Sequence, residues 1–230
     1  MKSRMDFELE HNEIISLYES SATQIEIALF TKRYELNETH FGLLAIQSIA
    51  ILYSYWEGFI QRSFSLYIDY LNEQNIEFRS FSDSVRIQLM ENTFKQFREY
   101  PQKSEKKTAF FQKLDSFYDS SQHELTRLVS TEDNVGFKVL NKLLLQFSLE
   151  PFPKQWGRYK YPNSSLEELL NTFLRYRNGV AHGGDTSSEE KVTQEVYSKY
   201  KILIIDLMYE IHEKIMLGIH NKTYLNTALT

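Results

Sequence analysis

Residues 40–72 carry the feature that most limits how this chain can fold: apolar side chains recur every three or four residues, and no proline interrupts them. This spacing places the side chains on one face of an α-helix. At 1.5 Å of rise per residue, the helix would be roughly 50 Å long, enough to form the spine of a helical bundle. The apolar face consists of Leu44/Ala45, Ile49, Leu52, Trp56, Ile60, Phe64, Tyr67 and Leu71.

The rest of the chain also favours long helices. Its 230 residues include only four prolines and eight glycines, which argues against a turn-rich sandwich. The sequence therefore predicts an all-α fold, an up-down bundle with long antiparallel helices. A single domain is expected over residues 1–230, with residues 76–163 as a helical insertion that ends in a proline-rich loop. Four further helices are expected at residues 6–34, 82–98, 105–120 and 189–217. Another is expected to begin at a cap formed by Ser130 or Thr131 and to end before Pro151, and a last one is expected to begin at residue 165.

Several residues carry more local predictions about these helices. Gly42 and Gly58 are expected to mark close approaches to neighbouring helices or points of local weakness. Gly218 is expected to end the last helix, which residues 185–188 would cap. In the helix at 105–120, the side chains expected to point inside are Phe110, Phe111, Leu114 and Phe117.

Composition and charge exclude some classes of protein. The absence of cysteine excludes disulfides and thiolate metal sites and suits a reducing cytoplasm. The N-terminus has no apolar signal region, and the longest apolar runs are too short to span a bilayer, so a cytoplasmic protein with no membrane partner is expected. The formal net charge of −5 argues against a broad nucleic-acid-coating surface, although a small basic cleft remains compatible with it.

The chain shows no metal-ligand pattern. Neither an H-E-x-x-H segment, a P-loop, a G-x-S-x-G segment nor a clustered carboxylate set is present. His212 and Glu213 share a predicted helix without partners at ligand spacing, which favours a structural role over a metal site. We therefore expect neither a metal nor another cofactor.

Residues 165–184, SLEELLNTFLRYRNGVAHGG, contain the candidate chemistry. Ser164 and Glu167 predict a capping box at the start of the helix. Arg177 falls within its apolar stripe, where an unpaired charge would be heavily penalised. Its guanidinium must therefore meet an acid inside the fold or face a cleft that can hold an anion. Glu57, at the border of the long apolar face, is the acid that could pair with Arg177 or set the charge state of a nearby histidine, or it could be a solvated surface residue.

His182 follows Arg177 by five residues and has the side chain that titrates nearest neutral pH. Gly179 loosens the turn between them, and Gly183 and Gly184 are expected to end the helix, which would release His182 from strict helical geometry. Asn178 lies one turn before His182 and could orient its imidazole.

Two segments resemble a known family. RNGVAHG resembles the R-x4-6-H motif of HEPN domains, helical proteins of bacterial defence and toxin systems, and ILYSYWEGFIQ resembles the second helix of the MAE_28990/MAE_18760-like HEPN family. The resemblance implies a HEPN-like bundle that acts as a metal-independent endoribonuclease of a defence or toxin–antitoxin type system. It would cleave single-stranded RNA by 2′-OH attack, as a homodimer, with an antitoxin or another defence-system protein as a possible partner.

The same resemblance assigns roles to four residues. Arg177 would stabilise the phosphate, His182 would act as acid or base, Asn178 would orient, and Glu57 would assist. Gly184 stands where similar proteins often carry an acid, so no acidic contribution is expected there. Two alternatives stay open: Arg177 and His182 could simply hold the bundle together, or the domain could be a non-catalytic HEPN-like module that binds RNA or a protein.

Residues 151–163, PFPKQWGRYKYPN, interleave bases with aromatic residues and contain no acid. Cationic side chains hold phosphates and flat rings stack on bases, so this composition suits single-stranded RNA. The alternative is a proline-rich connector whose rings pack onto the bundle. The candidate RNA-binding residues are Lys154, Trp156, Arg158, Tyr159, Lys160 and Tyr161.

Overall fold

The structure is a computed structural model. It describes residues 2–31, 34, 36–97, 99–120, 123–127, 129–131, 134–157, 165–181 and 192–226. Over these residues the fold is all-α, as predicted, with seven α-helices and no strand. The α-helices are α1 (Arg4–Phe30), α2 (Glu38–Glu73), α3 (Asp83–Thr93), α4 (Ser104–Asp119), α5 (Phe137–Gln146), α6 (Leu166–Ala181) and α7 (Gln194–Asn221), with short 3₁₀ turns at Phe78–Ser80 and Lys95–Phe97.

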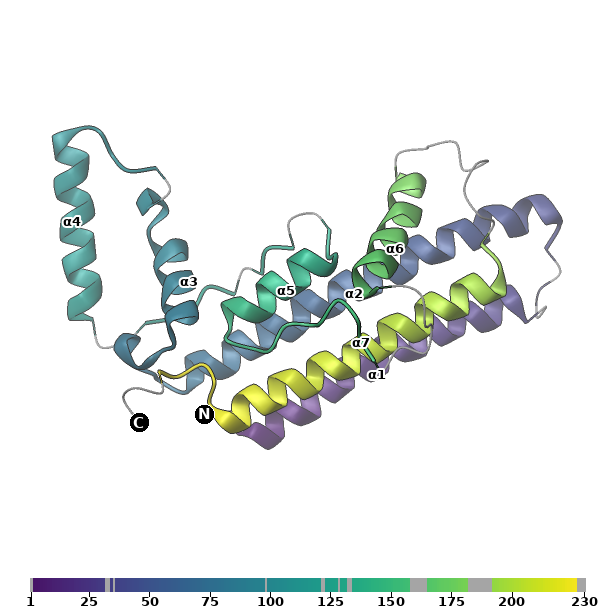
Figure 1. The fold of residues 1–230 in the computed structure, drawn as a ribbon, viewed down its shortest axis with the longest axis horizontal. Helices are drawn as coiled ribbons and strands as arrows, with labels where there is room; N and C mark the ends of the chain where they lie inside the picture. The colour runs from purple at the N-terminus through teal and green to yellow at the C-terminus, as the bar shows by residue number, and fades with distance from the viewer. Residues whose placement is uncertain are drawn as a thin grey trace.

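Three long helices, α1, α2 and α7, form the body of the molecule (Figure 1). α1 runs antiparallel to both others: Phe7 near its start packs on Tyr70 near the end of α2, and Arg4 contacts His220 near the end of α7. Farther along, the Tyr197 hydroxyl of α7 donates to the Ala22 carbonyl of α1 at 2.9 Å. The long antiparallel helices that the apolar periodicity predicted are therefore present.

α2 is the spine of this bundle. Of the described helices, it is the one long and apolar enough to cross a membrane by length and composition. Its apolar face packs against α1, α6 and α7, so it has the position of a core helix in this bundle. The side chains that this face buries completely include Trp56, Phe59, Ile60, Phe64 and Tyr67.

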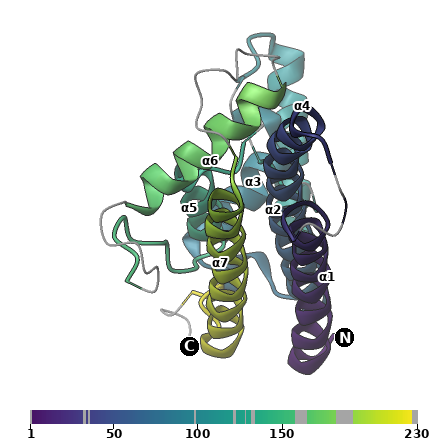
Figure 2. The same ribbon diagram turned by 90° about the vertical axis from the view of Figure 1, so that its right-hand side faces the viewer.

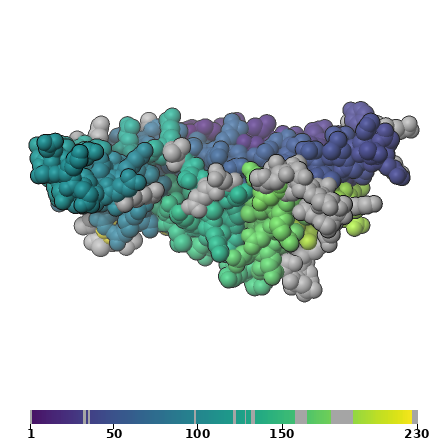
Figure 3. All heavy atoms as spheres, turned by 90° about the horizontal axis from the view of Figure 1, so that it is seen from above, coloured from purple at the N-terminus to yellow at the C-terminus, as the bar shows by residue number. Residues whose placement is uncertain are grey.

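α5 and α6 cover one side of the long helices. α6 packs across α2, and α5 packs against α6 and α3 (Figure 2). Phe173 of α6 stacks on Tyr200 of α7 at 5.2 Å and lies 5.7 Å from Tyr53 of α2, so α6 is seated over the junction of α2 and α7. Seen from above, α6 forms a ridge beside the long helices (Figure 3).

α3 and α4 form an arm at one end of the molecule, where α4 stands away from the three long helices (Figure 1). Phe110 is the buried residue of α4, while Phe111 is half-exposed. The expectation that Phe111 points inside is therefore wrong. The bundle core meets α4 near its end, at Phe117, so Phe111 has few neighbours to cover it.

α1 ends at Phe30 and α3 at Thr93, before the expected residues 34 and 98, and two helices start about five residues later than expected. α5 begins at Phe137 with Gly136 as its N-cap, because Thr131 uses its hydroxyl to reach Glu57 rather than to cap a helix. α7 begins after Thr193, whose hydroxyl accepts from the Val196 N–H at 3.3 Å. The cap predicted at residues 185–188 lies outside the described residues.

The last helix does not end at Gly218, where the sequence predicted its end. α7 continues through Gly218 to Asn221 and ends at Lys222, which takes a left-handed conformation with φ of 53°. Gly218 is needed inside the helix because a Cβ there would overlap Cδ2 of Leu149. Gly58 is also a close approach, since a Cβ would lie 2.7 Å from the Tyr18 hydroxyl, whereas Gly42 has no neighbour within 4 Å. The predicted close approach at Gly42 is therefore wrong.

Candidate functional site

A capping box fixes the start of the motif helix, α6. The Ser165 hydroxyl accepts from the Glu168 N–H at 3.2 Å, and the Glu168 carboxylate accepts from the Ser165 N–H at 2.9 Å. The box is the predicted type but lies one residue after the predicted pair, Ser164 and Glu167, because Ser165 is the residue directly before the first turn. From this start, the helical period buries Leu169, Leu170 and Phe173 and carries the chain to Arg177.

Arg177 is partly buried against α2. Its guanidinium carbon lies 5.3 Å from the centre of the Tyr53 ring, a cation–π contact, and its Nη1–H donates to Oδ1 of Asn178 at 3.0 Å. The helical spacing correctly placed Arg177 on the packed face, and an aromatic ring rather than an aliphatic side chain accommodates its charge. The bond to Asn178 uses one of the five guanidinium donors and fixes the plane of the group.

Glu57 lies near the same ring without touching the arginine. Among the described residues, the structure contains no ion pair between Glu57 and Arg177; instead the Thr131 hydroxyl donates to Oε1 of Glu57 at 3.0 Å. Direct pairing, one of the two roles predicted for Glu57, is therefore not formed. Burial, and secondarily the negative charge of Glu57, raise the pKa of Tyr53 to about 12, so the phenol keeps its proton at neutral pH.

The W-E-G segment of α2 holds the chain that precedes α5. The indole N–H of Trp56 donates to the Val135 carbonyl at 2.9 Å, and the Val135 N–H donates to the Tyr53 hydroxyl at 2.8 Å. Both polar groups of one buried residue are thus satisfied by α2. The residues that precede this anchored segment include Thr131, which reaches Glu57.

Tyr53 and Thr131 are contributors that the sequence reasoning missed. Tyr53 had a detectable signal, since it lies one helical turn before Glu57 in the segment that resembles the HEPN helix. Thr131 had none, because the long connection between α4 and α5 brings it to the site.

His182 lies outside the described residues, directly after the end of α6 at Ala181. Asn178 was expected to orient its imidazole, and the structure assigns its carbonyl oxygen to Arg177 instead. The amide nitrogen of Asn178 is the group that could still serve a histidine. The roles of these residues stay predictions.

The proline-rich segment is described only in part. Lys154 lies 3.3 Å from the Glu167 carboxylate, and the partly buried Trp156 packs edge-on against Phe152 at 5.6 Å. These two residues make the contacts of a connector that packs onto the bundle. The other four candidates, Arg158, Tyr159, Lys160 and Tyr161, lie outside the described residues, so RNA binding by this segment stays a prediction.

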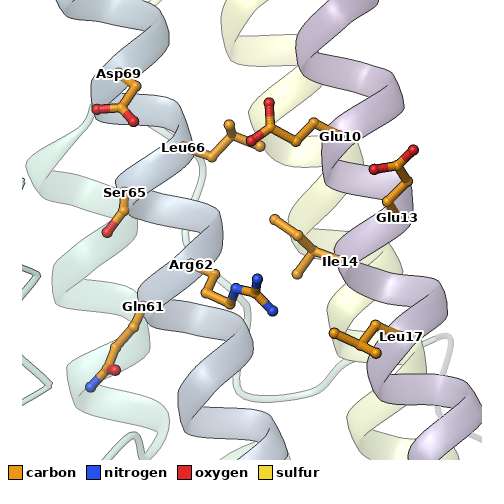
Figure 4. A pocket seen from close by; sticks show the side chains of 9 residues that line it. All are labelled: Glu10, Glu13, Ile14, Leu17, Gln61, Arg62, Ser65, Leu66 and Asp69. Atoms are coloured by element: carbon orange, nitrogen blue, oxygen red, sulfur yellow. The ribbon is translucent and has the colours of Figure 1, made fainter.

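A groove of about 670 Å³ opens between α1 and α2 (Figure 4). In Figure 4, Arg62 reaches from α2 toward α1, which presents Glu10 and Glu13. Glu10 also pairs with Lys2, and Asp69 pairs with Arg127. With those two carboxylates paired, Glu13 and Arg62 leave the groove without a net positive charge that would attract phosphate, so it does not favour RNA.

A pair of buried histidines joins α1 to α7. Nδ1 of His11 lies 2.8 Å from Nδ1 of His212, and the two rings stack at 5.0 Å. Burial, and then the neighbouring His212, lower the pKa of His11 to about 3. Among the described residues, no group of three or more His, Asp or Glu side chains is placed to hold a metal ion, so this pair has no third ligand there.

Comparison with known proteins supports the resemblance. No curated protein and no solved structure matches the chain significantly. The sequence model of the RiboL-PSP-HEPN family matches residues 10–217, about nine-tenths of the chain, including the long helices, Glu57, Arg177 and His182. The HEPN assignment predicted from the two segments is thus confirmed, with the match falling on this HEPN family rather than on the MAE_28990/MAE_18760-like one that the α2 segment resembles. The chain belongs to the RiboL-PSP-HEPN family of helical domains.

Proposed function

We propose that this protein is an endoribonuclease that cleaves single-stranded RNA without a metal ion. RNA cleavage by 2′-OH attack needs a base to take the proton from the hydroxyl, an acid to protonate the departing 5′ oxygen, and positive charge beside the phosphorane. Arg177 supplies the charge, because a guanidinium stays protonated and grips phosphate oxygens with two parallel donors. His182 transfers protons near neutral pH. The products are a 2′,3′-cyclic phosphate and a 5′-hydroxyl.

The observation that carries this proposal is the state of Arg177. Its side chain is partly buried in a HEPN-family fold, yet its contacts are a cation–π contact with the neutral Tyr53 ring and a hydrogen bond to the neutral Asn178 amide. Glu57 does not form an ion pair with it. An arginine that only held the bundle together would be expected to meet its acid directly. A held guanidinium that pairs with no acid among the described residues suits the charge that develops on a phosphate in the transition state.

Glu57 and Asn178 have supporting roles in this proposal. Asn178 fixes the guanidinium plane through its carbonyl oxygen, and its amide nitrogen orients the imidazole of His182. Glu57 assists from the far side of Tyr53, where its carboxylate adds negative potential that favours a protonated histidine.

The proposed active form is a homodimer. Each chain carries one motif histidine, whereas the reaction uses a base and an acid. A two-fold axis that brings two α6 helices together would supply the second imidazole. The proposed setting is a cytoplasmic bacterial defence or toxin–antitoxin type system, in which an antitoxin or another defence protein restrains the nuclease.

An RNA cleavage assay in excess EDTA tests the proposal. Purified protein is expected to cut a single-stranded RNA and to leave cyclic phosphate ends. Replacement Arg177→Ala is expected to lower the rate by about 10²- to 10³-fold, the usual loss for one transition-state donor. Replacement His182→Ala is expected to cost about 10²- to 10⁴-fold, the usual range for one proton-transfer group.

Arg175 provides a matched control on the same helix. It is exposed, donates to the Thr172 hydroxyl at 3.0 Å and stands two residues before Arg177, so Arg175→Ala should leave cleavage unchanged. A folded wild-type protein that binds RNA or a protein but cuts no RNA would instead indicate a non-catalytic HEPN-like module. An equal fall in melting temperature for Arg177→Ala and His182→Ala, with no separate loss of rate, would indicate a structural pair.

A further inference from the structure

The arm formed by α3 and α4 carries a cluster of exposed aromatic rings. Phe97, Tyr100 and Phe111 are 51%, 48% and 50% exposed. Each contacts the buried ring of Phe110, with centroid distances of 5.6, 6.1 and 5.4 Å. Because all three rings contact Phe110, they form a single surface. We call these four residues and Lys107 the Phe110 patch.

One lysine lies over a ring of this cluster, and three more are close in the sequence. Nζ of Lys107 lies 5.4 Å from the centre of the Tyr100 ring, and Lys95, Lys103 and Lys106 are exposed nearby in the sequence. Lys113 has a different role, since it donates to the Thr93 carbonyl at 3.0 Å and ties α4 to α3.

The charge of this segment opposes that of the whole chain. Residues 95–113 contain six basic and two acidic residues, a net charge of +4, in a chain whose formal net charge is −5. The other 211 residues therefore carry −9. The excess is confined to this segment, because the whole arm, residues 83–119, has seven basic and six acidic residues. It therefore attracts polyanions to residues 95–113 rather than to the arm as a whole.

The surroundings of the patch favour a nucleic acid over a protein partner. The arm stands at the end of the molecule, and the patch lies toward its outer tip, at the start of α4 (Figures 1 and 3). Protein interfaces are depleted in lysine at their centre, whereas proteins that hold single strands combine cationic side chains with rings on which bases stack. The Phe110 patch has the second composition.

We propose that the Phe110 patch binds single-stranded RNA outside the Arg177 site, with bases stacked on its half-exposed rings and phosphates beside its lysines. The inference rests on the proposed function, which supplies RNA as the ligand and gives the arm the role of a substrate holder. The arm and α6 rise on the same side of the long helices, so one strand could engage both (Figure 1).

Fluorescence anisotropy with a labelled 20-nucleotide 2′-O-methyl oligouridine tests the proposal. The 2′-O-methyl group removes the attacking hydroxyl, so binding is measured without cleavage. Replacement Phe111→Ala is expected to weaken binding by about 5- to 150-fold, the usual effect of losing one stacking ring. The double replacement Lys106→Gln/Lys107→Gln is expected to reduce the slope of log K against log salt by about 0.7 for each lost phosphate contact. The controls are Tyr34→Ala, an equally exposed ring, and Arg4→Gln, an exposed base on α1.

The outcomes separate this proposal from the proposed nuclease activity. Loss of binding in the arm variants, with both controls unchanged, supports the patch even if the wild type cuts no RNA. Wild-type affinity in Phe111→Ala and in the lysine double variant overturns it, as does a folded wild type that does not bind the oligonucleotide. Arm variants that bind RNA normally but fail to self-associate, or to retain a protein partner, would identify the arm as a protein interface and also overturn it.

Discussion

Lowering the pH from 7.5 to 5.5 is expected to destabilise this protein, and the buried imidazole of His11 makes one contribution, beside that of His212, whose pKa burial also lowers. Its ring is fully buried, its Nδ1 lies 2.8 Å from Nδ1 of His212, and its Nε2 has no hydrogen-bond partner among the described residues. A buried N–H without an acceptor costs more than a bare lone pair in an apolar site. The hydrogen bond therefore assigns the donor proton to Nδ1 of His11 and the acceptor lone pair to Nδ1 of His212.

The magnitude follows from proton linkage. The pKa of folded His11 is about 3, whereas an unfolded histidine has a pKa of about 6.5. Between these values the unfolded chain binds a proton that the folded chain does not, so the free energy of unfolding falls as the pH decreases, by up to about 1.4 kcal/mol per unit. Integrated from pH 7.5 to 5.5, the contribution of His11 is a loss of about 1.4 kcal/mol, and the loss continues toward pH 3.

Urea unfolding at several pH values measures this effect. Replacement His11→Asn keeps an N–H donor near the position of Nδ1 but cannot titrate, so it should remove about 1.4 kcal/mol of the difference between pH 7.5 and 5.5. The void that it leaves lowers stability equally at both pH values. Burial also lowers the pKa of His212, against the raising effect of Glu213 and Glu8, so part of the pH dependence remains in His11→Asn.

An exposed histidine serves as the control. His40 lies at the start of α2, and His40→Asn should leave the pH dependence as in the wild type. A pH dependence in His11→Asn as steep as that of the wild type would refute the assignment of a neutral, buried His11.

Two further predictions concern the bundle and the site. Gly218→Ala should lower the free energy of unfolding by about 1–3 kcal/mol, because the added Cβ would overlap Leu149 and overpack the core. Gly42→Ala should raise the free energy of unfolding by about 0.5–1 kcal/mol, because Gly42 lies inside a helix with open space around it. Urea unfolding midpoints of the two variants measure both effects. Tyr53→Phe removes the acceptor of the Val135 N–H and should cost about 1–3 kcal/mol while leaving the ring under the guanidinium. Melting curves together with RNA cleavage check the last prediction, and a loss of cleavage with unchanged stability would show a direct chemical role for the phenol.

Helix periodicity was the most reliable guide to the architecture. The apolar repeat at residues 40–72 predicted α2 within about two residues at each end, and the starting turns of α1 and α4 were placed equally well. These elements are long or strongly patterned, so the side chains that specify them are local in the sequence. Boundaries that depend on distant contacts were placed less well. Thr131 reads as a helix cap in the sequence, but its hydroxyl bonds to Glu57 on another helix.

In the candidate site, too, the features that depend on local sequence were predicted and those that depend on distant contacts were not. Arg177, Asn178 and Glu57 were found from spacing and from the resemblance to HEPN motifs. The contacts of these residues could not be predicted from the sequence. Asn178 bonds to Arg177, Tyr53 lies beneath the guanidinium, and Glu57 bonds to Thr131. These contacts depend on how the helices and the connection before α5 pack on α2.

The arm is the clearest case of a surface that only the tertiary structure assembles. In the sequence, Phe111 has the spacing of an inward-facing residue, and the lysines near residue 105 read as a solvated loop. In the fold, the last turns of α4 pack on Phe78 and His123, whereas nearer its start the rings of Phe97, Tyr100 and Phe111 collect around Phe110 and stay half-exposed. The sequence alone determined the helices and the HEPN family, because both are recorded in local spacing. The docking of the helices decided which charges are neutralised and which rings face solvent, because burial is a property of the neighbours that a side chain acquires on folding.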